Sequence, residues 1–291
     1  MTSEKIIDIL KNGKIHLSCE LFPPKQGAEL QNSLEIVNQI AASKPSYMSV
    51  TYGAGGSTVG YSAALAKKVQ DNGMPALAHL TCVKADEAKL AEVIGQLQGF
   101  GVKNILALRG DIPADMQGEE IGSFAHASEL MRFVKQQGDF CVGGAAYPEG
   151  HPESGSLEKD IENTKYKVDA GVDFLVTQMF FDNTILYNYM FRLLRAGINV
   201  PVVPGIMPVT NAKQIIRICQ LSGTKLPPQF CAMVEKFADK PEALKQAGIA
   251  YATGQIIDLI ANGFDNVHIY TMNKPEIFAG IMDNLGEIVD K

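Results

Sequence analysis

The sequence predicts a single (β/α)8 TIM barrel of the α/β class, and three observations lead to this fold. Eight short runs of apolar and β-branched residues alternate with longer segments of helical spacing along the 291 residues. Several of these runs are almost wholly apolar, as is typical of parallel strands that are covered on both faces. No Gly/Ser-rich linker or run of charge divides the chain, so we expect one catalytic domain over residues 1–291.

The eight expected strands are spread over the whole chain. They cover residues 15–22, 47–52, 75–82, 104–109, 141–147, 174–180, 201–206 and 266–271. Six helical segments end in a glycine just before the next strand, where glycine readily adopts the left-handed conformation of a helix C-cap. These glycines stand in the sequences DNGMP, GFGVKN, QQGDF, DAGVDF, RAGINV and ANGFDN.

Two segments lie outside this simple alternation. Residues 1–14 have the pattern of a short amphipathic helix, with Ile6, Ile7 and Leu10 on one face. Residues 210–265 are longer than one helix requires, so we expect an extra helix between the seventh and eighth strands. A doubly wound open sheet is the alternative fold, but FPPK follows the first strand where that fold would have a glycine-rich phosphate turn.

Composition argues against several classes of function. A formal charge of −6 and a pI near 5.4 argue against a nucleic-acid binder, because phosphate contacts need clustered Lys and Arg. A small anionic ligand needs only a local cationic pocket and stays possible. The longest apolar runs are too short to cross a bilayer, and the N-terminus lacks the order of a signal peptide. Five scattered cysteines without a CxxC pair indicate reduced thiols in a cytoplasmic protein, with no disulfide framework or metal site.

Polar and ionisable residues recur at the ends of the expected strands, where barrels of this kind carry their reactive groups. They are Glu20, Thr51–Tyr52, His79–Thr81, Arg109–Asp111, Tyr147–His151, Gln178 and Tyr270–Asn273. Solvated residues scattered along the chain would not recur at the end of nearly every strand, so the pattern indicates an enzyme-like pocket. At the first exit, the two prolines of CELFPPK cannot continue a strand, and we expect them to hold Glu20 just inside the rim.

Eight motifs occur in order between about residues 15 and 285. They read CELFPPK, VTYGAGGST, AHLTC, LALRGD, AAYPEGHPES, NTKYKVDAGVDFLVTQMFFD, VPGIMPVTN and IYTMNK. Together they resemble the catalytic domain of the methylenetetrahydrofolate reductase family, and the length fits the bacterial form, which lacks a C-terminal regulatory domain. The resemblance implies an FAD-containing barrel that reduces 5,10-methylenetetrahydrofolate to 5-methyltetrahydrofolate. It also implies NADH or NADPH as cosubstrate, with NADH the expected donor, ping-pong hydride transfer through FAD, a product that feeds methionine synthesis, and a homo-oligomer, either dimer or tetramer.

Two carboxylates are the expected catalytic residues. The resemblance implies that Glu20 is the general acid at folate N10, and such an acid needs its pKa raised by burial. The alternative for Glu20 is a solvated carboxylate paired with Lys25. The resemblance places Asp111 near the flavin pyrimidine and the folate pterin, where a carboxylate can hydrogen-bond the pterin amino group and lower the flavin's reduction potential. The alternative for Asp111 is a helix N-cap or turn residue.

The resemblance further implies a set of contacts to FAD. The matched positions are Thr51, Tyr52, His79, Leu108, Arg109, Gly110, Asp111, Ala146, Tyr147, His151, Asp160, Asn163 and Lys167. Arg109 and Lys167 can neutralise the pyrophosphate, and a tyrosine can pack on a cofactor ring. Asp160, Asn163 and Lys167 share one helix face, so one ligand can meet all three. Taken alone, His79 would more often be a packed core histidine, and Lys167 would be a solvated helix residue.

The expected folate contacts include three further residues and one departure from the family pattern. The substrate-binding positions are Glu20, Asp111, Gln178, Tyr270 and Lys274. Gln178 has a donor and an acceptor in one amide, as the pterin edge requires. Lys274 stands where some members carry arginine, and the two are not equivalent partners for a carboxylate or phosphate.

Two further motifs bear on the ligands. The glycines of YGAGGST leave bare backbone for the cofactor, with Ser57 as a hydrogen-bonding partner, but Val59 follows where relatives often carry a polar residue. The pair Phe180–Phe181 is more often core packing than a cofactor contact, although a phenylalanine at the barrel mouth could stack on a ligand ring.

Two alternative functions stay open at this point. Another FAD-binding barrel, of the proline dehydrogenase type, would want an arginine pair for the substrate carboxylate near the last strand, and IYTMNKPE supplies none. A barrel without a cofactor, acting as a binding or scaffold protein, would be colourless after purification, whereas a flavoprotein is yellow.

Overall fold

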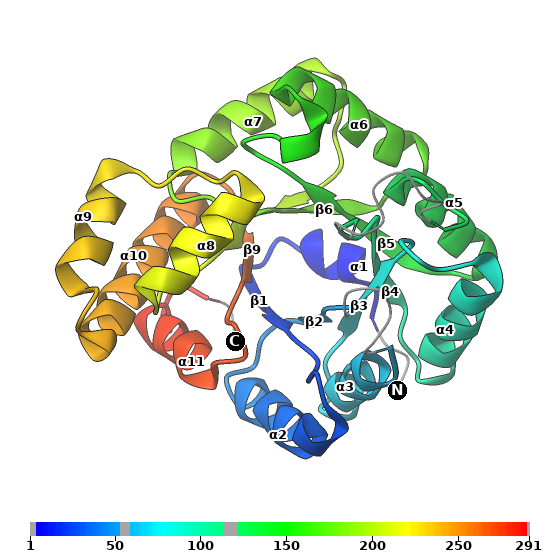
Figure 1. Ribbon diagram of the computed structural model, residues 1–291, viewed down its shortest axis with the longest axis horizontal. Coiled ribbons are helices and arrows are strands. Elements are labelled where there is room, and N and C mark those ends of the chain that lie inside the picture. The colour runs from blue at the N-terminus through cyan, green and yellow to red at the C-terminus, as the bar shows by residue number, and fades with distance from the viewer. Residues whose placement is uncertain (1–3, 53–58, 113–121, 290–291) are drawn as a thin grey trace.

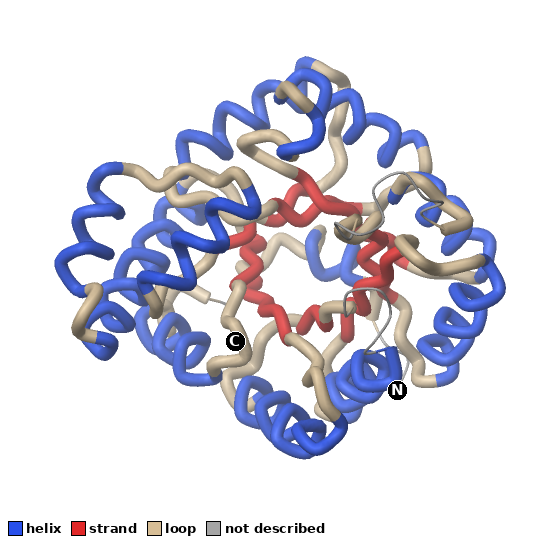
Figure 2. Tube along the Cα trace, in the orientation of Figure 1, coloured by secondary structure: helices blue, strands red, loops and turns tan. Residues whose placement is uncertain are grey.

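The computed structural model describes residues 4–52, 59–112 and 122–289, and in these ranges a ring of parallel strands is enclosed by helices (Figures 1 and 2). The strands are β1 (His16–Leu21), β2 (Met48–Val50), β3 (Ala76–Thr81), β4 (Asn104–Leu108), β5 (Cys141–Ala146), β6 (Phe174–Thr177), β7 (Val202–Val203), β8 (Gly205–Ile206) and β9 (Asn266–Ile269). The helices are α1 (Ile6–Leu10), α2 (Leu30–Ala41), α3 (Val59–Asp71), α4 (Glu87–Gly99), α5 (Ala127–Gln137), α6 (Leu157–Asp169), α7 (Asn183–Arg195), α8 (Ala212–Ser222), α9 (Pro228–Phe237), α10 (Pro241–Ala261) and α11 (Pro275–Asn284). Short 3-10 helices, Gly27–Glu29 and Pro152–Ser154, lie on the loops after β1 and β5.

The sheet confirms the predicted barrel, with one interruption. Its strand order is β7-β6-β5-β4-β3-β2-β1-β9-β8, and every pairing is parallel. β7 and β8 occupy the seventh expected strand and are separated by Pro204, so the ring closes through this split strand. Pro204 has no N–H to donate, although its carbonyl accepts the N–H of His268 at 2.8 Å. The next N–H, from Gly205, donates to the side-chain Oγ1 atom of Thr177 on β6 at 2.9 Å instead of to a backbone carbonyl.

Helix α1 lies across the inside of the ring, behind the strands in the view of Figure 1. Its buried side chains are Ile6, Ile9 and Leu10, and Ile7 is partly buried and packs against the same cluster as Ile6 and Leu10, as the helical pattern predicted. Ile6 and Leu10 pack with apolar residues that point into the barrel, among them Phe174. The Ile6 N–H donates to Oδ1 of the buried Asn104 at 2.8 Å, which ties the helix to the first residue of β4. The N-terminal segment therefore fills the barrel interior.

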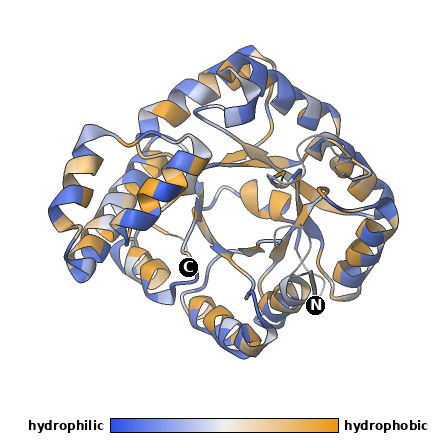
Figure 3. Ribbon diagram, in the orientation of Figure 1, coloured by the Kyte–Doolittle hydropathy of each residue, from blue (hydrophilic) through white to orange (hydrophobic). Residues whose placement is uncertain are grey.

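Most of the core lies between the strands and the outer helices. Apolar residues, orange in Figure 3, gather on the helix faces that turn toward the sheet. A further cluster lies beneath α8, α9 and α10, and it includes Phe181, whose ring lies 4.4 Å from that of Phe230. Phe180 and Phe181 are both buried, and they follow the sixth strand, which ends at Thr177, earlier than predicted. Both residues therefore pack in the core.

Two local expectations can be compared with the backbone. Five of the six predicted C-cap glycines have φ between 76 and 88°, whereas Gly138 is extended, at φ 164°. The prediction was wrong there because the chain after α5 makes a tighter turn, in which the Phe140 N–H donates to the Gly138 carbonyl.

Between β8 and β9 the segment 210–265 contains three helices, α8, α9 and α10. None of the helices among the described residues has the length and apolar character needed to cross a bilayer.

Candidate active site at the C-terminal rim of the barrel

Glu20 is the next-to-last residue of β1, and its side chain points into the barrel near the C-terminal rim. The residue is only 8% exposed, whereas Lys25 is exposed, so a solvated pairing of the two is wrong. The loop after β9 holds the backbone at this exit. The Thr271 hydroxyl donates to the Glu20 carbonyl at 3.0 Å. Glu20 is therefore positioned by a second strand exit.

Asn273 locks the residue after β1 through both ends of its side-chain amide. Its Oδ1 accepts the N–H of Phe22, and its Nδ2 donates to the Phe22 carbonyl, each at 2.8 Å. Asn273 itself has φ 57°, a left-handed conformation that asparagine tolerates better than most residues. The spacing of sequence motifs could not reveal this role, because the two residues are 251 positions apart.

Burial sets the protonation of Glu20 and of its nearest ionisable neighbour, His79. It raises the pKa of the Glu20 carboxyl to about 8 and lowers the pKa of His79 to about 3. The Nε2 atom of His79 lies 3.7 Å from Oε2 of Glu20, too far for a hydrogen bond, and has no other partner. At neutral pH the two groups therefore form a neutral acid beside a neutral imidazole, and no ion pair.

A second histidine, His268 on β9, lies deeper in the barrel between two serines. Its Nδ1 is 2.8 Å from the hydroxyl of Ser18, and its Nε2 is 3.1 Å from the hydroxyl of Ser49. Burial lowers the pKa of His268 to about 3, so the ring is neutral. The sequence analysis missed these three residues, although strand periodicity could have found them. Ser18, Ser49 and His268 lie two positions before Glu20, Thr51 and Tyr270, and side chains two positions apart in a strand point to the same face.

Tyr270 reaches from β9 to the exit of β6. Its hydroxyl donates to the Thr177 carbonyl at 2.6 Å, and burial raises its pKa well above the ordinary value. Gly205 makes room for the ring, because a Cβ there would lie 2.6 Å from a ring carbon of Tyr270. The sequence pattern did not identify this glycine as a site residue.

The basic residue Arg109 follows β4 and is engaged by a carboxylate. Its Nη1 and Nη2 donate to Oε2 and Oε1 of Glu153 at 2.6 and 2.9 Å, and its Nε donates to the Gly110 carbonyl at 3.1 Å. The mutual hydrogen bonds raise the pKa of Arg109 and lower that of Glu153. Glu153 was not among the predicted site residues, although it stands in the motif that follows β5.

Lys167 and two aromatic residues form the neighbouring part of the rim. Nζ of Lys167 donates to the Ala145 carbonyl at 2.6 Å and lies 5.6 Å from the centre of the Tyr147 ring. Burial lowers the pKa of Lys167 to about 8, so its charge is held less firmly than that of a solvated lysine. The Tyr147 ring meets the His151 ring edge to face at 4.7 Å.

Two of the three predicted ligand residues of helix α6 contact the same serine, Ser154. Oδ1 of Asp160 accepts the Ser154 hydroxyl at 3.0 Å, and Nδ2 of Asn163 lies 3.4 Å from the same hydroxyl oxygen. The other carboxylate oxygen of Asp160, Oδ2, is buried and has no partner. A buried, unpartnered carboxylate oxygen costs free energy unless it accepts a hydrogen bond, so it suits a hydroxyl or amino group of a ligand.

The remaining predicted site residues have these positions. Asp111 is exposed just after β4, and Gln178 follows β6 with its Oε1 accepting the Met179 N–H at 2.9 Å. Nζ of Lys274 donates to the Thr210 hydroxyl at 2.6 Å. Thr51, Tyr52, Leu108 and Ala146 lie at or just after strand ends. Ser57 and the side chain of Val59 lie outside the described residues.

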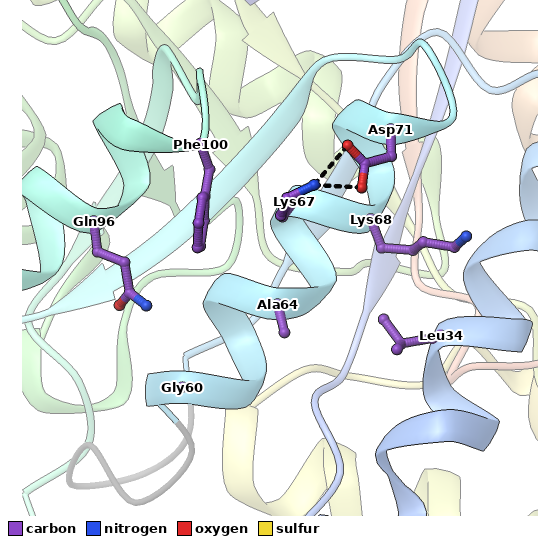
Figure 4. A pocket seen from close by; sticks show the side chains of 8 residues that line it. All are labelled: Leu34, Gly60, Ala64, Lys67, Lys68, Asp71, Gln96 and Phe100. Atoms are coloured by element: carbon purple, nitrogen blue, oxygen red, sulfur yellow. Dashed lines mark hydrogen bonds and ion pairs between the residues drawn. The ribbon is translucent and has the colours of Figure 1, made fainter.

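Two hollows open on the outer helical layer, away from the strand exits. One, of about 330 Å³, lies between α2, α3 and α4 and contains the ion pair of Lys67 and Asp71, with contacts of 2.9 and 2.6 Å (Figure 4). The other, of about 450 Å³, lies on α7 and the segment 198–200. Neither contains a residue of the predicted site. The chemistry-bearing groups of the described chain are concentrated at the strand exits.

Comparison with known proteins places the whole chain in one group. The family model described as Methylenetetrahydrofolate reductase matches residues 5–286. The 5,10-methylenetetrahydrofolate reductase of Escherichia coli K12 is 34% identical over 275 residues, which cover 94% of this chain and 92% of that protein. Methylenetetrahydrofolate reductase (NADH) 1 of Arabidopsis thaliana is 34% identical over 299 residues, and the chain spans about half of the length of this plant relative.

A solved structure supports the fold alone. It is an uncharacterised protein from Clostridium thermocellum, described as binding two copies of 5-methyl-5,6,7,8-tetrahydrofolic acid. The similarity has a TM-score of 0.68 at 12% sequence identity and covers 97% of this chain and 99% of that one.

Proposed function

The chain belongs to the methylenetetrahydrofolate reductase family, and from this premise we propose that it reduces 5,10-methylenetetrahydrofolate to 5-methyltetrahydrofolate with NADH as electron donor and FAD as cofactor. The observation that carries the proposal is the buried carboxyl of Glu20, kept protonated at the rim where barrel enzymes do their chemistry. The family membership favours this activity over that of a proline dehydrogenase. A role in methionine synthesis, a cytoplasmic location and homo-oligomeric assembly stay predictions.

Glu20 acts in this proposal as the general acid. Opening the five-membered ring of the substrate requires a proton at N10, and a carboxyl with a pKa of about 8 is largely protonated at neutral pH. His79, neutral and 3.7 Å away, adds no positive charge that would favour the carboxylate. The surroundings thus keep the carboxyl of Glu20 protonated, and Thr271 holds its backbone.

Residues at the C-terminal ends of β4 and β5, together with residues of α6, fit FAD. Tyr147 offers a ring face, Arg109 and Lys167 offer cationic groups, and the open Oδ2 of Asp160 can accept a hydrogen bond from a cofactor hydroxyl. When bound, the flavin would accept a hydride from the nicotinamide and deliver it to the exocyclic carbon of the folate, in ping-pong order. What the chain's own groups do is to bind, orient and shield that cofactor.

Gln178 and Asp111 are proposed to bind the pterin. The Gln178 amide lies at the exit of β6 with its NH2 group available, while Oε1 accepts a backbone N–H. Asp111 is exposed directly after β4 and can accept from the pterin amino group. Lys274, anchored by Thr210, offers a cation for the glutamate end of the folate.

The test of the function separates its two halves. The purified protein should be yellow, with the visible spectrum of an oxidised flavin. In stopped-flow experiments NADH should bleach this spectrum faster than NADPH does, and methylenetetrahydrofolate should restore it. A protein that stays colourless after FAD is added, or a reduced flavin that the folate does not reoxidise, would contradict the proposal.

A further inference from the structure

Both terminal nitrogens of the Arg109 guanidinium are engaged by Glu153. The contacts of 2.6 and 2.9 Å form a bidentate pair, and Nε donates to the Gly110 carbonyl. Three of the five N–H groups that a guanidinium carries are therefore in use. A phosphate group presents two oxygens to arginine in the same parallel geometry as a carboxylate does. A diphosphate that made the same end-on bidentate contact with both terminal nitrogens would have to replace Glu153.

The position of Glu153 makes this replacement inexpensive. Its side chain is 55% exposed, against 23% for Arg109, so the carboxylate lies on the solvent side of the pair. Ion pairs with an exposed partner contribute little net free energy, because water solvates the freed carboxylate. Glu153 stands in the short 3-10 helix Pro152–Ser154, whose backbone is held separately by the N–H of Glu153 donating to Nδ1 of His151 at 3.2 Å. Only the side chain has to move.

Other charged groups lie near the ion pair of Arg109 and Glu153. Lys167, the other cation that faces this part of the rim, donates to a backbone carbonyl and has its pKa lowered by burial. Asp160 and Asp111 add negative charge on the same side, and both act on Tyr147 between them. Lys167 is still largely charged at neutral pH, but of these two cations only Arg109 is paired with a carboxylate among the described residues, so competition for an anionic ligand concerns Arg109.

We propose that Glu153 is an internal competitor for the diphosphate of FAD, which displaces the Glu153 carboxylate from Nη1 and Nη2 of Arg109. The inference rests on the proposed function, since it takes FAD as the ligand of this rim. Glu153 is then a residue that sets how tightly the cofactor is held, and it weakens binding relative to a neutral residue at the same position. It takes no part in the transfer of hydride or proton.

The test compares the dissociation constant for FAD. It is measured from the rise in flavin fluorescence at equilibrium after serial dilution of the holoprotein. Glu153→Gln should lower the dissociation constant by about two- to fivefold, the factor that corresponds to an exposed ion pair. Glu153→Asp keeps the charge but shortens the reach to the guanidinium, so it should lower the dissociation constant by a smaller factor. Glu158→Gln is the matched control, because Glu158 is an exposed carboxylate paired with Arg192 at 2.7 Å, and it should leave the dissociation constant unchanged.

Each other outcome contradicts the inference. Weaker FAD binding by Glu153→Gln would mean that Glu153 holds Arg109 in place for the cofactor. A dissociation constant equal to that of the Glu158→Gln control would mean that the ion pair stays intact beside bound FAD. A wild-type protein that holds no FAD would overturn the proposed function itself, and the inference with it. Equal dissociation constants in proteins that do hold FAD would overturn the inference alone.

Discussion

The Nε2 atom of His79 lies 3.7 Å from Oε2 of Glu20, and burial moves the pKa values of the two groups in opposite directions, to about 3 and about 8. The pair is therefore neutral at the pH where the acid would have to act. A charged histidine at this distance would favour the carboxylate and make Glu20 a poorer proton donor. The relationship thus supports the role of Glu20 as an acid, and it leads to the first three predictions.

Glu20→Gln should separate the two half-reactions. The amide keeps the size of the side chain but has no acidic proton for N10, so folate reduction should fall by about 10²–10⁴-fold. FAD content and the oxidation of NADH should stay at the wild-type level, because Glu20 lies on the folate side of the proposed reaction. Stopped-flow kinetics of each half-reaction would measure this, with the exposed Glu29→Gln as control. Full folate reduction by Glu20→Gln would remove the acid role.

The pH dependence of the folate half-reaction should follow the acid form of Glu20. The protonated carboxyl prevails below a pKa of about 8, so the rate constant should be level near neutral pH and fall about tenfold per unit above about 8. His79 and Tyr270 do not titrate in this window, because burial lowers the pKa of the first and raises that of the second. A rate that rises with pH through this range would contradict the assignment.

The free energy of unfolding should also depend on the protonation of Glu20. The pKa of Glu20 is about 8 in the folded chain against 4.5 ordinarily, so the native state binds the extra proton between these values. Its contribution to the free energy of unfolding is fully present below about 4.5 and is lost as pH rises, by at most about 1.4 kcal/mol per unit. Glu20→Gln should therefore gain stability relative to wild type as pH rises from 5 to about 8. Urea unfolding at several pH values would measure the difference, and a constant difference would contradict the burial argument.

Gly205→Ala should destabilise the protein by about 1–3 kcal/mol, because the new methyl group would press on the Thr177 carbonyl oxygen and on the Tyr270 ring, which lies 2.6 Å away, in a packed interior. The displaced ring would also lose its hydrogen bond to the Thr177 carbonyl. Thermal or urea unfolding would show the loss. Gly254→Ala is the control, since a Cβ at Gly254 meets no atom within 4 Å and alanine favours the helix. Equal stability of the two variants would refute the close packing at Gly205.

Asn273→Ala should lower both stability and folate reduction. It removes two hydrogen bonds to Phe22 and leaves alanine at φ 57°, with an expected loss of about 1–3 kcal/mol. Asn273→Gly removes the same bonds but tolerates the backbone conformation, so it should be the more stable of the two. A drop in the folate half-reaction shared by both variants, with flavin reduction by NADH retained, would show that the loop positions Glu20. A normal folate half-reaction in both would show that it does not.

Much of the architecture could be predicted from residue patterns. Apolar runs of period two or without period, punctuated by glycines, reflect short-range preferences of the backbone and the need to cover both faces of a parallel sheet. The interrupted seventh strand escaped prediction, because Pro204 changes the hydrogen bonds of its neighbours without changing the apolar pattern. The extended Gly138 escaped for a similar reason, since a local turn replaced the expected cap.

By itself, the sequence determined the barrel, the alternation of side chains along the strands and the residues at the strand ends, Glu20 among them. These depend on the order of side chains along one strand, which a chain carries before it folds. Only the tertiary structure decided that Glu20 faces His79, that His268 lies between Ser18 and Ser49, and that Arg109 pairs with Glu153. Such contacts join residues tens or hundreds of positions apart, and their distances are set by the register of the strands and the closure of the ring.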